Sequence, residues 1–236
     1  MNTAFYIFLF VLSILFRPLL AQEYDAKVES LLQLSQSYYN QKKHLESASL
    51  FKKIVDSLEF IDPLSSIRLC KDIGAFYHIK RNHYEALNYY FRGINLIKNP
   101  INAESNTLFY IKFIDKSFDK GRGFKTEVAR DEGLSLYAQL YSRLGGVYFN
   151  RGNFSKAKEY WNLSLKISIA NNFSKGMASA FNNIAEISRL ENKPKEALFL
   201  YHKATKILRQ LNDDFTLSLY YSNIALSYLE LKQLDS

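Results

Sequence analysis

Four histidines and one cysteine are the residues of this chain best suited to bind a metal or to act as a nucleophile or base. They are His44, His78, His83, His202 and Cys70. Cys70 and His78 are eight positions apart, which separates them by about 12 Å along one helix. This distance is too long for a shared ion, so we expect Cys70 to be a packed, small apolar side chain. No HExxH, GxSxG or Walker pattern occurs, and we predict a chain that is no enzyme, with no catalytic residue, metal or cofactor.

Composition indicates which kind of secondary structure must position any functional residue. The 236 residues are 47% hydrophobic and include only nine Gly and four Pro, which favours a helix-rich folded protein over a turn-dense sandwich or barrel. A single cysteine excludes a disulfide scaffold. The net charge of +8 comes from basic residues interspersed with acidic ones. Because no basic stripe or tail appears, we interpret the charge as solubility and predict no nucleic-acid partner.

The N-terminus has the pattern of a targeting segment. Ala4 to Phe16 is apolar except for one Ser, and Ala21 precedes a polar stretch. Thirteen residues rise about 20 Å as a helix, short of the roughly 30 Å hydrocarbon core of a membrane. We predict a signal peptide over 1–21, export to a periplasmic or other extracytoplasmic location, and no membrane insertion after cleavage. An uncleaved N-terminal anchor is the alternative.

The rest of the chain repeats itself with a period near 40. Small residues recur at five positions, here called first anchors: Ser35, Gly74, Gly145, Ala185 and Ala225. Twelve residues after each of the first four stands another small residue, a second anchor: Ser47, Ala86, Ala157 and Ala197. Four residues later stands an aromatic: Phe51, Tyr90, Trp161 and Tyr201. Three residues after the first anchors stand Tyr38, Tyr77, Tyr148, Ser188 and Tyr228. Four offsets held in register indicate a repeat architecture.

Segments 34–54, 73–94, 144–165 and 183–204 resemble the tetratricopeptide repeat (TPR) family, whose unit combines Leu-Gly and Tyr on helix A with Ala-x3-Phe on helix B. The resemblance implies an all-α, right-handed superhelical solenoid of antiparallel helix pairs with a concave face. Small anchors let the two helices approach closely, and the aromatics fill the remaining space.

The repeat register divides the chain into units. We predict TPR units over 22–62, 63–100, 133–172 and 173–212, an insertion or degenerate repeat over 101–132, and a truncated fifth unit over 213–236. Helices are expected at 26–41, 46–59, 65–80, 84–98, 134–150, 155–170, 175–191, 195–211 and 215–232. The last helix should leave an apolar face partly open, formed by Leu219, Ile224, Leu226, Tyr228 and Leu231.

The resemblance also implies a peptide-binding groove along the A helices. The groove positions, carried over by register, are Gln36, Tyr39, Lys71, His78, Ser142, Phe149, Asn182, Asn183, Glu186, Arg189, Ser222 and Asn223. Asn183 and Asn223 occupy the same register, and their amides can grip an extended peptide backbone. The alternative is that these amides hydrogen-bond neighbouring helices and hold the spacing of the units. The family's clamp for C-terminal carboxylates is incomplete, since Lys71 matches it but Ala75 stands where an Asn is wanted.

The predicted function is that of an exported TPR scaffold that binds a protein or peptide partner on its concave face. Its arrangement resembles the sensor segments of bacterial signalling kinases and transcriptional regulators. The alternative is a substrate-recognition arm of an enzyme whose catalytic domain is not in this chain.

Overall fold

A computed structural model describes residues 28–59, 63–98 and 127–234, which are helices joined by short turns. The predicted signal peptide and nearly all of the predicted insertion lie outside the described residues. The chain divides into two compact units, Met1–Ile61 and Asp62–Ser236, and each is described by itself. No strand occurs in the described ranges, so the predicted all-α class is confirmed.

The described part of the first unit is one helix pair. A helix over residues 28–40 precedes α2 (His44–Glu59). Ser35 and Ser47, the first and second anchors, are both fully buried, and the Ser35 hydroxyl donates to the Ser47 carbonyl at 3.2 Å. Phe51, the aromatic of this pair, is also buried. The two helices therefore meet at the residues that the repeat register predicts.

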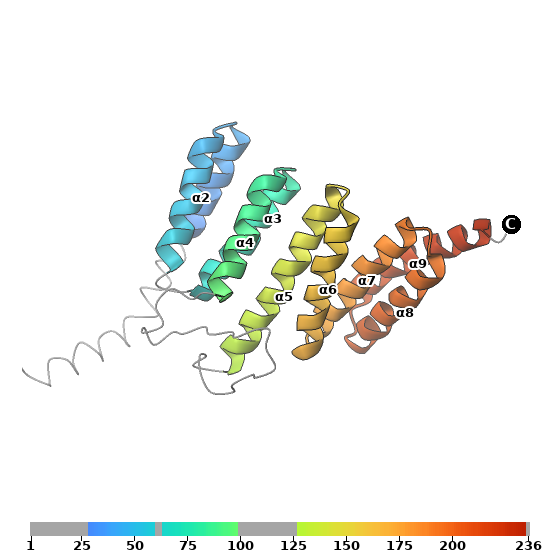
Figure 1. The fold of residues 1–236 in the computed structure, drawn as a ribbon. Helices are drawn as coiled ribbons and strands as arrows, with labels where there is room; N and C mark the ends of the chain where they lie inside the picture. Colours follow the sequence, from blue (N-terminus) through green and yellow to red (C-terminus); the bar gives the residue numbers. More distant parts are fainter. Residues whose placement is uncertain (1–27, 60–62, 99–126, 235–236) are drawn as a thin grey trace, which may run out of the picture. The chain divides into compact units, whose positions relative to one another are not determined.

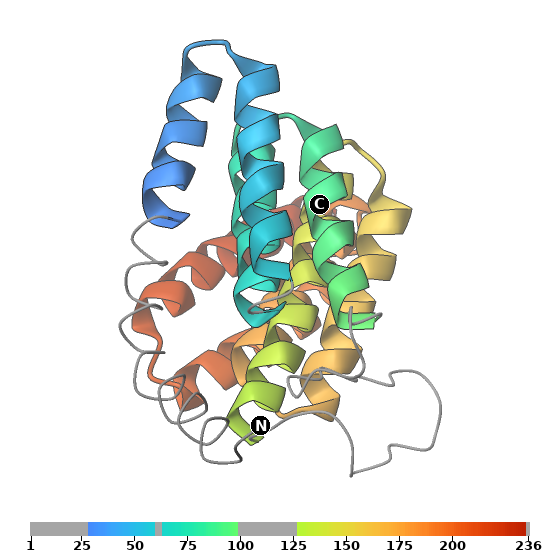
Figure 2. The ribbon, with the colours of Figure 1, turned by 90° about the vertical axis from the view of Figure 1, so that its left-hand side faces the viewer.

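The described residues of the second unit form seven helices in chain order (Figures 1 and 2). They are α3 (Pro63–Ile79), α4 (His83–Lys98), α5 (Glu127–Asn150), α6 (Phe154–Ala170), α7 (Ser174–Leu190), α8 (Pro194–Gln210) and α9 (Asp214–Leu234). All bounds lie within two residues of the predicted ones except the start of α5, which was expected at residue 134. The helix begins about two turns earlier, inside the predicted insertion. Its first turns contain good helix formers, and Glu132 forms an ion pair with Arg68 of α3.

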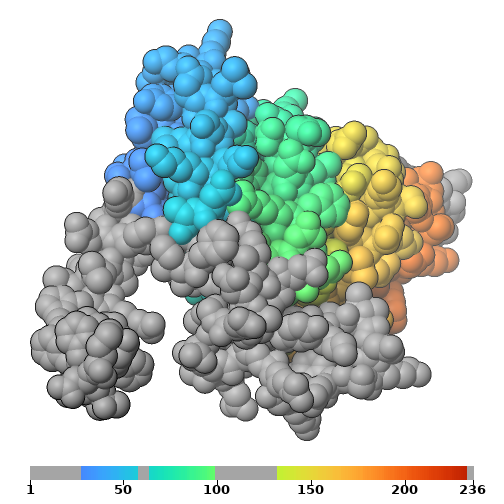
Figure 3. Space-filling model, turned by 60° about the vertical axis from the view of Figure 1, so that its left-hand side comes forward, coloured from blue at the N-terminus to red at the C-terminus, as the bar shows by residue number. Residues whose placement is uncertain are grey.

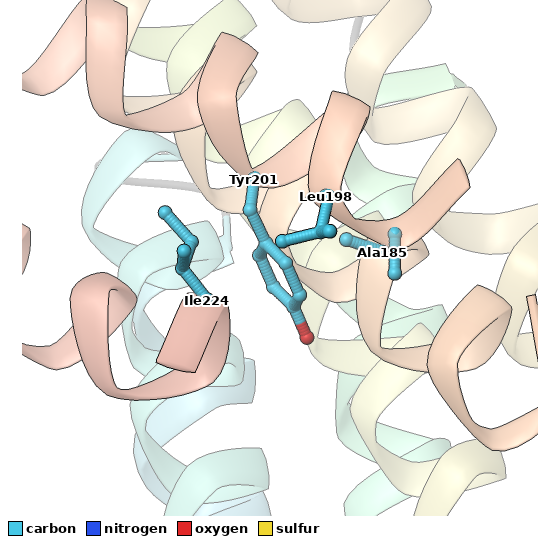
Figure 4. Close-up of a cluster of buried hydrophobic side chains, with 5 residues drawn as sticks. Ala185, Leu198, Tyr201 and Ile224 are labelled. Atoms are coloured by element: carbon cyan, nitrogen blue, oxygen red, sulfur yellow. The ribbon is translucent and has the colours of Figure 1, made fainter. Parts of the chain in front are cut away.

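Helices A and B of each pair meet where small residues face aromatic rings. A Cβ on Gly74 would lie 2.6 Å from Cδ1 of Tyr90, and one on Gly145 would lie 2.8 Å from Cε2 of Trp161. Such distances leave no room for any larger side chain at either glycine. In the third pair Ala185 takes this place. Figure 4 shows the Tyr201 ring between Ala185 of α7 and Ile224 of α9, beside Leu198.

The second anchors behave in the same way. Ala86, Ala157 and Ala197 are all fully buried. Ala157 lies in a cluster with Trp161 and with Ile184 and Ile187 of the next helix. A small residue on helix B therefore lets one pair approach the following pair, and the predicted register is confirmed in the second unit.

The A helices form a layer of their own within the second unit. Each helix packs on the next along the chain, and the backbone of α3 also approaches α5, that of α5 approaches α7, and that of α7 approaches α9. The backbones of the B helices α4 and α6 lie farther apart and are bridged by large side chains, with the rings of Phe91 and Tyr160 centred 6.3 Å apart. Within the second unit, Figure 3 shows the green, yellow and orange surfaces of successive helix pairs one after another. Residues of equal register on α3, α5, α7 and α9 are thus brought to one face.

Most turns between the described helices share one backbone conformation. The central residue has a positive φ in each case: Lys42 (63°), Arg81 (60°), Gly152 (74°), Asn172 (52°), Asn192 (57°) and Asn212 (53°). The next residue closes the turn, as when the backbone N–H of Asn153 donates to the Tyr148 carbonyl at 2.9 Å. Gly and Asn tolerate this left-handed conformation well, whereas the lysine and the arginine adopt it with strain.

Candidate protein-binding face of the A helices

The candidate site is the face of α3, α5, α7 and α9 in the second unit. Register brings the predicted groove residues of these four helices to this face. Several of the residues contact one another across neighbouring A helices, and these contacts decide which groups remain available to a partner.

Between α3 and α5 the predicted residues Lys71 and His78 already have partners. The Lys71 ammonium lies 3.5 Å from Oε1 of Gln139 and 3.5 Å from the carboxylate of Asp72. The amide nitrogen of Asn150 donates to Nε2 of His78 at 2.8 Å. Burial of the imidazole, followed by the charges of His83 and Arg143, lowers the pKa of His78. His78 is therefore neutral at pH 7 and accepts a hydrogen bond rather than presenting a positive charge.

Ser142 and Phe149 of α5 both contact Trp161 of α6. The indole N–H donates to the backbone carbonyl of Ser142 at 3.0 Å. The Phe149 ring packs 5.5 Å from the Trp161 ring and 5.4 Å from that of Phe154. Both residues thus help to hold the α5–α6 pair, and Phe149 contributes to the core more than the groove assignment implied.

Three predicted asparagines form a chain from α7 to α9. The amide nitrogen of Asn223 donates to Oδ1 of Asn182 at 3.0 Å, and that of Asn182 donates to Oδ1 of Asn183 at 3.4 Å. Asn223 therefore spans two consecutive A helices, as the alternative interpretation from the sequence required. Within the described residues no acceptor lies within hydrogen-bond distance of the Asn183 amide nitrogen, which leaves this donor available.

Glu186 and Arg189 form the centre of a charged network. Arg189 donates to the Glu186 carboxylate at 2.6 and 3.0 Å and also pairs with Glu230 of α9. The Tyr201 hydroxyl donates to Glu186 at 2.8 Å. The hydrogen bonds from Arg189, which outweigh burial, lower the pKa of Glu186, so the carboxylate stays ionised. This network links α7, α8 and α9 and occupies both predicted side chains.

The remaining predicted positions differ in their surroundings. Ser222 is exposed on α9, and its hydroxyl donates to the Ser218 carbonyl at 3.4 Å. Gln36 and Tyr39 belong to the first unit, where Gln36 is exposed and the Tyr39 ring packs edge-on to His44 at 4.5 Å. These two are described only within their own unit, so the structure does not place them beside the others.

Sequence reasoning missed the partners that join the A helices. Gln139, Asn150 and Glu230 each bond a predicted groove residue on a neighbouring helix. It also missed Arg143, which is exposed on α5 at the register of Asn183. A comparison of all residues two positions before each first anchor could have found Arg143, since Asn183 and Asn223 were selected at that offset.

The described ranges contain neither a cluster of metal-ligand side chains nor a membrane-spanning helix. Cys70 is buried, and no group of three His, Cys, Asp or Glu side chains there is arranged to hold an ion. None of the described helices is both long and apolar enough to cross a bilayer.

Comparison with known proteins identifies the repeat. Residues 136–210 match the tetratricopeptide repeat family model, a span that runs from α5 to the end of α8. No curated protein matches the chain in sequence.

Solved structures resemble the fold at low sequence identity. Aspartyl phosphate phosphatase F from Bacillus subtilis is 13% identical with a TM-score of 0.65, over 94% of this chain and 50% of that protein. BtubC from P. vanneervenii is 17% identical with a TM-score of 0.53, over 88% of this chain and 68% of that one. The apo form of RapI is 13% identical with a TM-score of 0.56, with the same two coverages of 88% and 68%. The chain therefore spans about half the length of the phosphatase, and the likeness is one of fold. The tetratricopeptide repeat match covers residues 136–210, and the anchor spacing described above recurs in α3, α4 and α9.

Proposed function

We propose that this chain is a non-catalytic scaffold that binds a segment of another protein along the A helices of its second unit. The observation that carries the proposal is the A layer itself. Four neighbouring A helices present side chains of equal register on one face, a surface suited to an extended segment. The fold likeness to a phosphatase carries no activity over to this chain, because that protein is about twice as long and 13% identical.

The groups that remain available favour contact with a peptide backbone on α5 and α7. The amide nitrogen of Asn183 is a free donor, and Arg143 is exposed at the same register one pair earlier. The polar contacts around them hold the helices, so the face is preorganised and loses little freedom on binding. In this proposal Lys71, His78, Asn182, Glu186, Arg189 and Asn223 fix the geometry of the face, and Arg143 and Asn183 contact the partner.

Peptide selection tests the proposal without a known partner. A random-peptide library displayed on phage is selected against the purified protein, and the affinity of each enriched peptide is measured by titration calorimetry. The loss of one hydrogen bond of about 0.5–1.5 kcal/mol predicts that Asn183→Ala weakens binding by roughly two- to tenfold. The control is Asn162→Ala, an exposed asparagine on the B helix α6, which should bind as the wild type does. Peptides that bind both variants with wild-type affinity would contradict the assignment of this face.

We also propose that the protein is exported and serves as the sensor part of a signal-transduction protein. The support is the apolar segment 4–16 with a small residue at Ala21, together with a repeat scaffold suited to protein partners. N-terminal sequencing of the protein purified from its cells should find Gln22 as the first residue. A full-length product in the cytoplasm would contradict export.

A further inference from the structure

Helix α9 exposes an apolar stripe that its role in the solenoid does not require. Phe215, Leu219, Leu226 and Leu229 are 78%, 53%, 49% and 60% exposed. Ile224 and Leu231, which were expected on the open face, lie instead on the opposite side of the helix. Ile224 is buried in a cluster with Tyr201 and Leu198, and Leu231 packs against that cluster. Single exposed apolar residues are ordinary, but four on one stripe of one helix mark an interaction surface.

The same register in the preceding A helix is polar. The positions 40 residues earlier on α7 hold Lys175, Ser179, Glu186 and Arg189. Packing of α7 in this array therefore does not require large apolar residues at these positions. Of these two A helices, only α9 carries the apolar stripe.

The stripe has the spacing of a helix–helix seam. Phe215, Leu219, Ser222, Leu226 and Leu229 follow one another at intervals of four, three, four and three residues. This alternation keeps side chains on one side of a helix that packs along another helix. The polar residue at its centre, Ser222, is small, and two further small residues, Ser218 and Ala225, flank it.

The stripe is complementary to itself when two copies run antiparallel. With a two-fold axis at Ser222, residues whose numbers are equally far from 222 lie at the same level on the two helices. Leu219 then lies within one residue of the level of Leu226 of the other copy, and Ser218 within one residue of the level of Ala225. Phe215 and Leu229 of the two copies lie level at both ends of the seam. Because Leu219 and Leu226 lie on one flank of the stripe and Ser218 and Ala225 on the other, leucines meet leucines along one flank and small residues meet small residues along the other. Both subunits use the same surface, as a two-fold dimer requires.

We propose that the protein forms a homodimer through antiparallel packing of α9 against α9 of a second copy, centred on Ser222. The exposed fractions of the large side chains correspond to about 500 Å² of surface on each copy, or about 1,000 Å² in the dimer. That area lies at the lower limit for a specific interface, so we expect a weak, reversible dimer.

Sedimentation equilibrium of the protein purified from its cells, over a wide range of concentration, tests the dimer. The wild type should change from the mass of one chain to twice that mass as its concentration rises. Leu219→Glu should weaken association at least tenfold, because it places two charges in the seam. The matched control is Phe199→Glu on α8, where an equally exposed phenylalanine (60%) lies outside the stripe. This control should associate as the wild type does, and circular dichroism should show both variants folded.

Cysteine cross-linking tests the register. Ser222→Cys should form a disulfide-linked dimer under mild oxidation, because the two residues face each other at the axis. Ser218→Cys should not, because its two copies lie about 12 Å apart along the helices. Cys70 is buried and does not compete. A wild type that stays monomeric overturns the proposal, and so does association that Leu219→Glu leaves intact or equal cross-linking of the two cysteine variants.

Discussion

Replacing either of two adjacent glycines of α5 by alanine should affect the stability of the protein differently. A Cβ on Gly145 would lie within 2.8 Å of the Trp161 indole, whereas a Cβ on Gly146 would meet only Cε1 of His78 at an ordinary 3.5 Å. The indole has little room to move, because it is 4% exposed, packs on Ala157 and Ile184, and donates to the Ser142 carbonyl. Gly145→Ala should therefore overpack the α5–α6 contact, and Gly146→Ala should not.

The expected difference in unfolding free energy follows from one contribution that the two variants share and one that only Gly145→Ala has. Each replaces a glycine inside a helix, which stabilises the helix by about 0.8–1.0 kcal/mol. This gain is the same at both sites, so the difference between the variants reports overpacking alone, about 1–3 kcal/mol. Gly146→Ala should be more stable than the wild type by about 0.5–1 kcal/mol, and Gly145→Ala should be equal to it or less stable by up to about 2 kcal/mol.

Urea unfolding followed by circular dichroism measures both variants against the wild type. Thermal unfolding offers a second reading, since each kcal/mol shifts Tm by about 2–4 °C in a chain of this size. Equal stabilisation by the two substitutions would show that the indole does not lie against Gly145, and the register of small and aromatic residues would then be wrong.

Three further predictions concern the core, the turns and acid stability. Ala157→Leu should lower the unfolding free energy by about 1–3 kcal/mol through overpacking. The control Lys166→Gln, at an exposed position, should change it by less than about 0.5 kcal/mol. A common urea midpoint for the two variants would refute the assigned anchor. Arg81→Gly should stabilise the protein, because it removes the backbone strain of a non-glycine residue at a φ of 60°. Gly152→Ala should destabilise it by about 1 kcal/mol through the same strain, although no atom lies near its Cβ. A reversed order of the two melting temperatures would argue against the turn conformation. Glu186 has a lowered pKa in the folded state, so its contribution is complete above the unfolded value of about 4.3 and is lost as pH falls through the lower folded value. Glu186→Gln should therefore weaken the protein at pH 7 and flatten the loss of stability in acid, and an unchanged acid slope would contradict the network around Arg189.

The fold could be predicted from the sequence because the packing requirement is local and repeated. Gly74 and Gly145 are needed where rings cross the partner helix, and Tyr90 and Trp161 follow at a fixed distance along the chain. The start of α5 could not be predicted in this way. The residues from Glu127 precede the anchor by several turns, and Glu132 gains its partner, Arg68, from a helix more than sixty positions earlier.

The candidate site was less predictable for a related reason. Register places Asn182, Asn183 and Asn223 on one face, but the hydrogen bond between Asn223 and Asn182 depends on the distance between two helices 41 positions apart. The same holds for Arg189 and Glu230. Sequence spacing therefore indicates which residues share a face, while the structure shows which of them already satisfy one another.

Site-specific photo-cross-linking in cells that make the full-length protein tests the central claim most directly. A photoreactive residue is placed at Arg143 or Asn183 on the A helices and, as controls, at Glu159 or Lys166, which are exposed on the B helix α6. If the A layer is the partner-binding face, one discrete cross-linked product with another protein should form from positions 143 and 183 and be absent from positions 159 and 166. The same product from the B-helix positions, with none from the A-helix positions, would contradict the account.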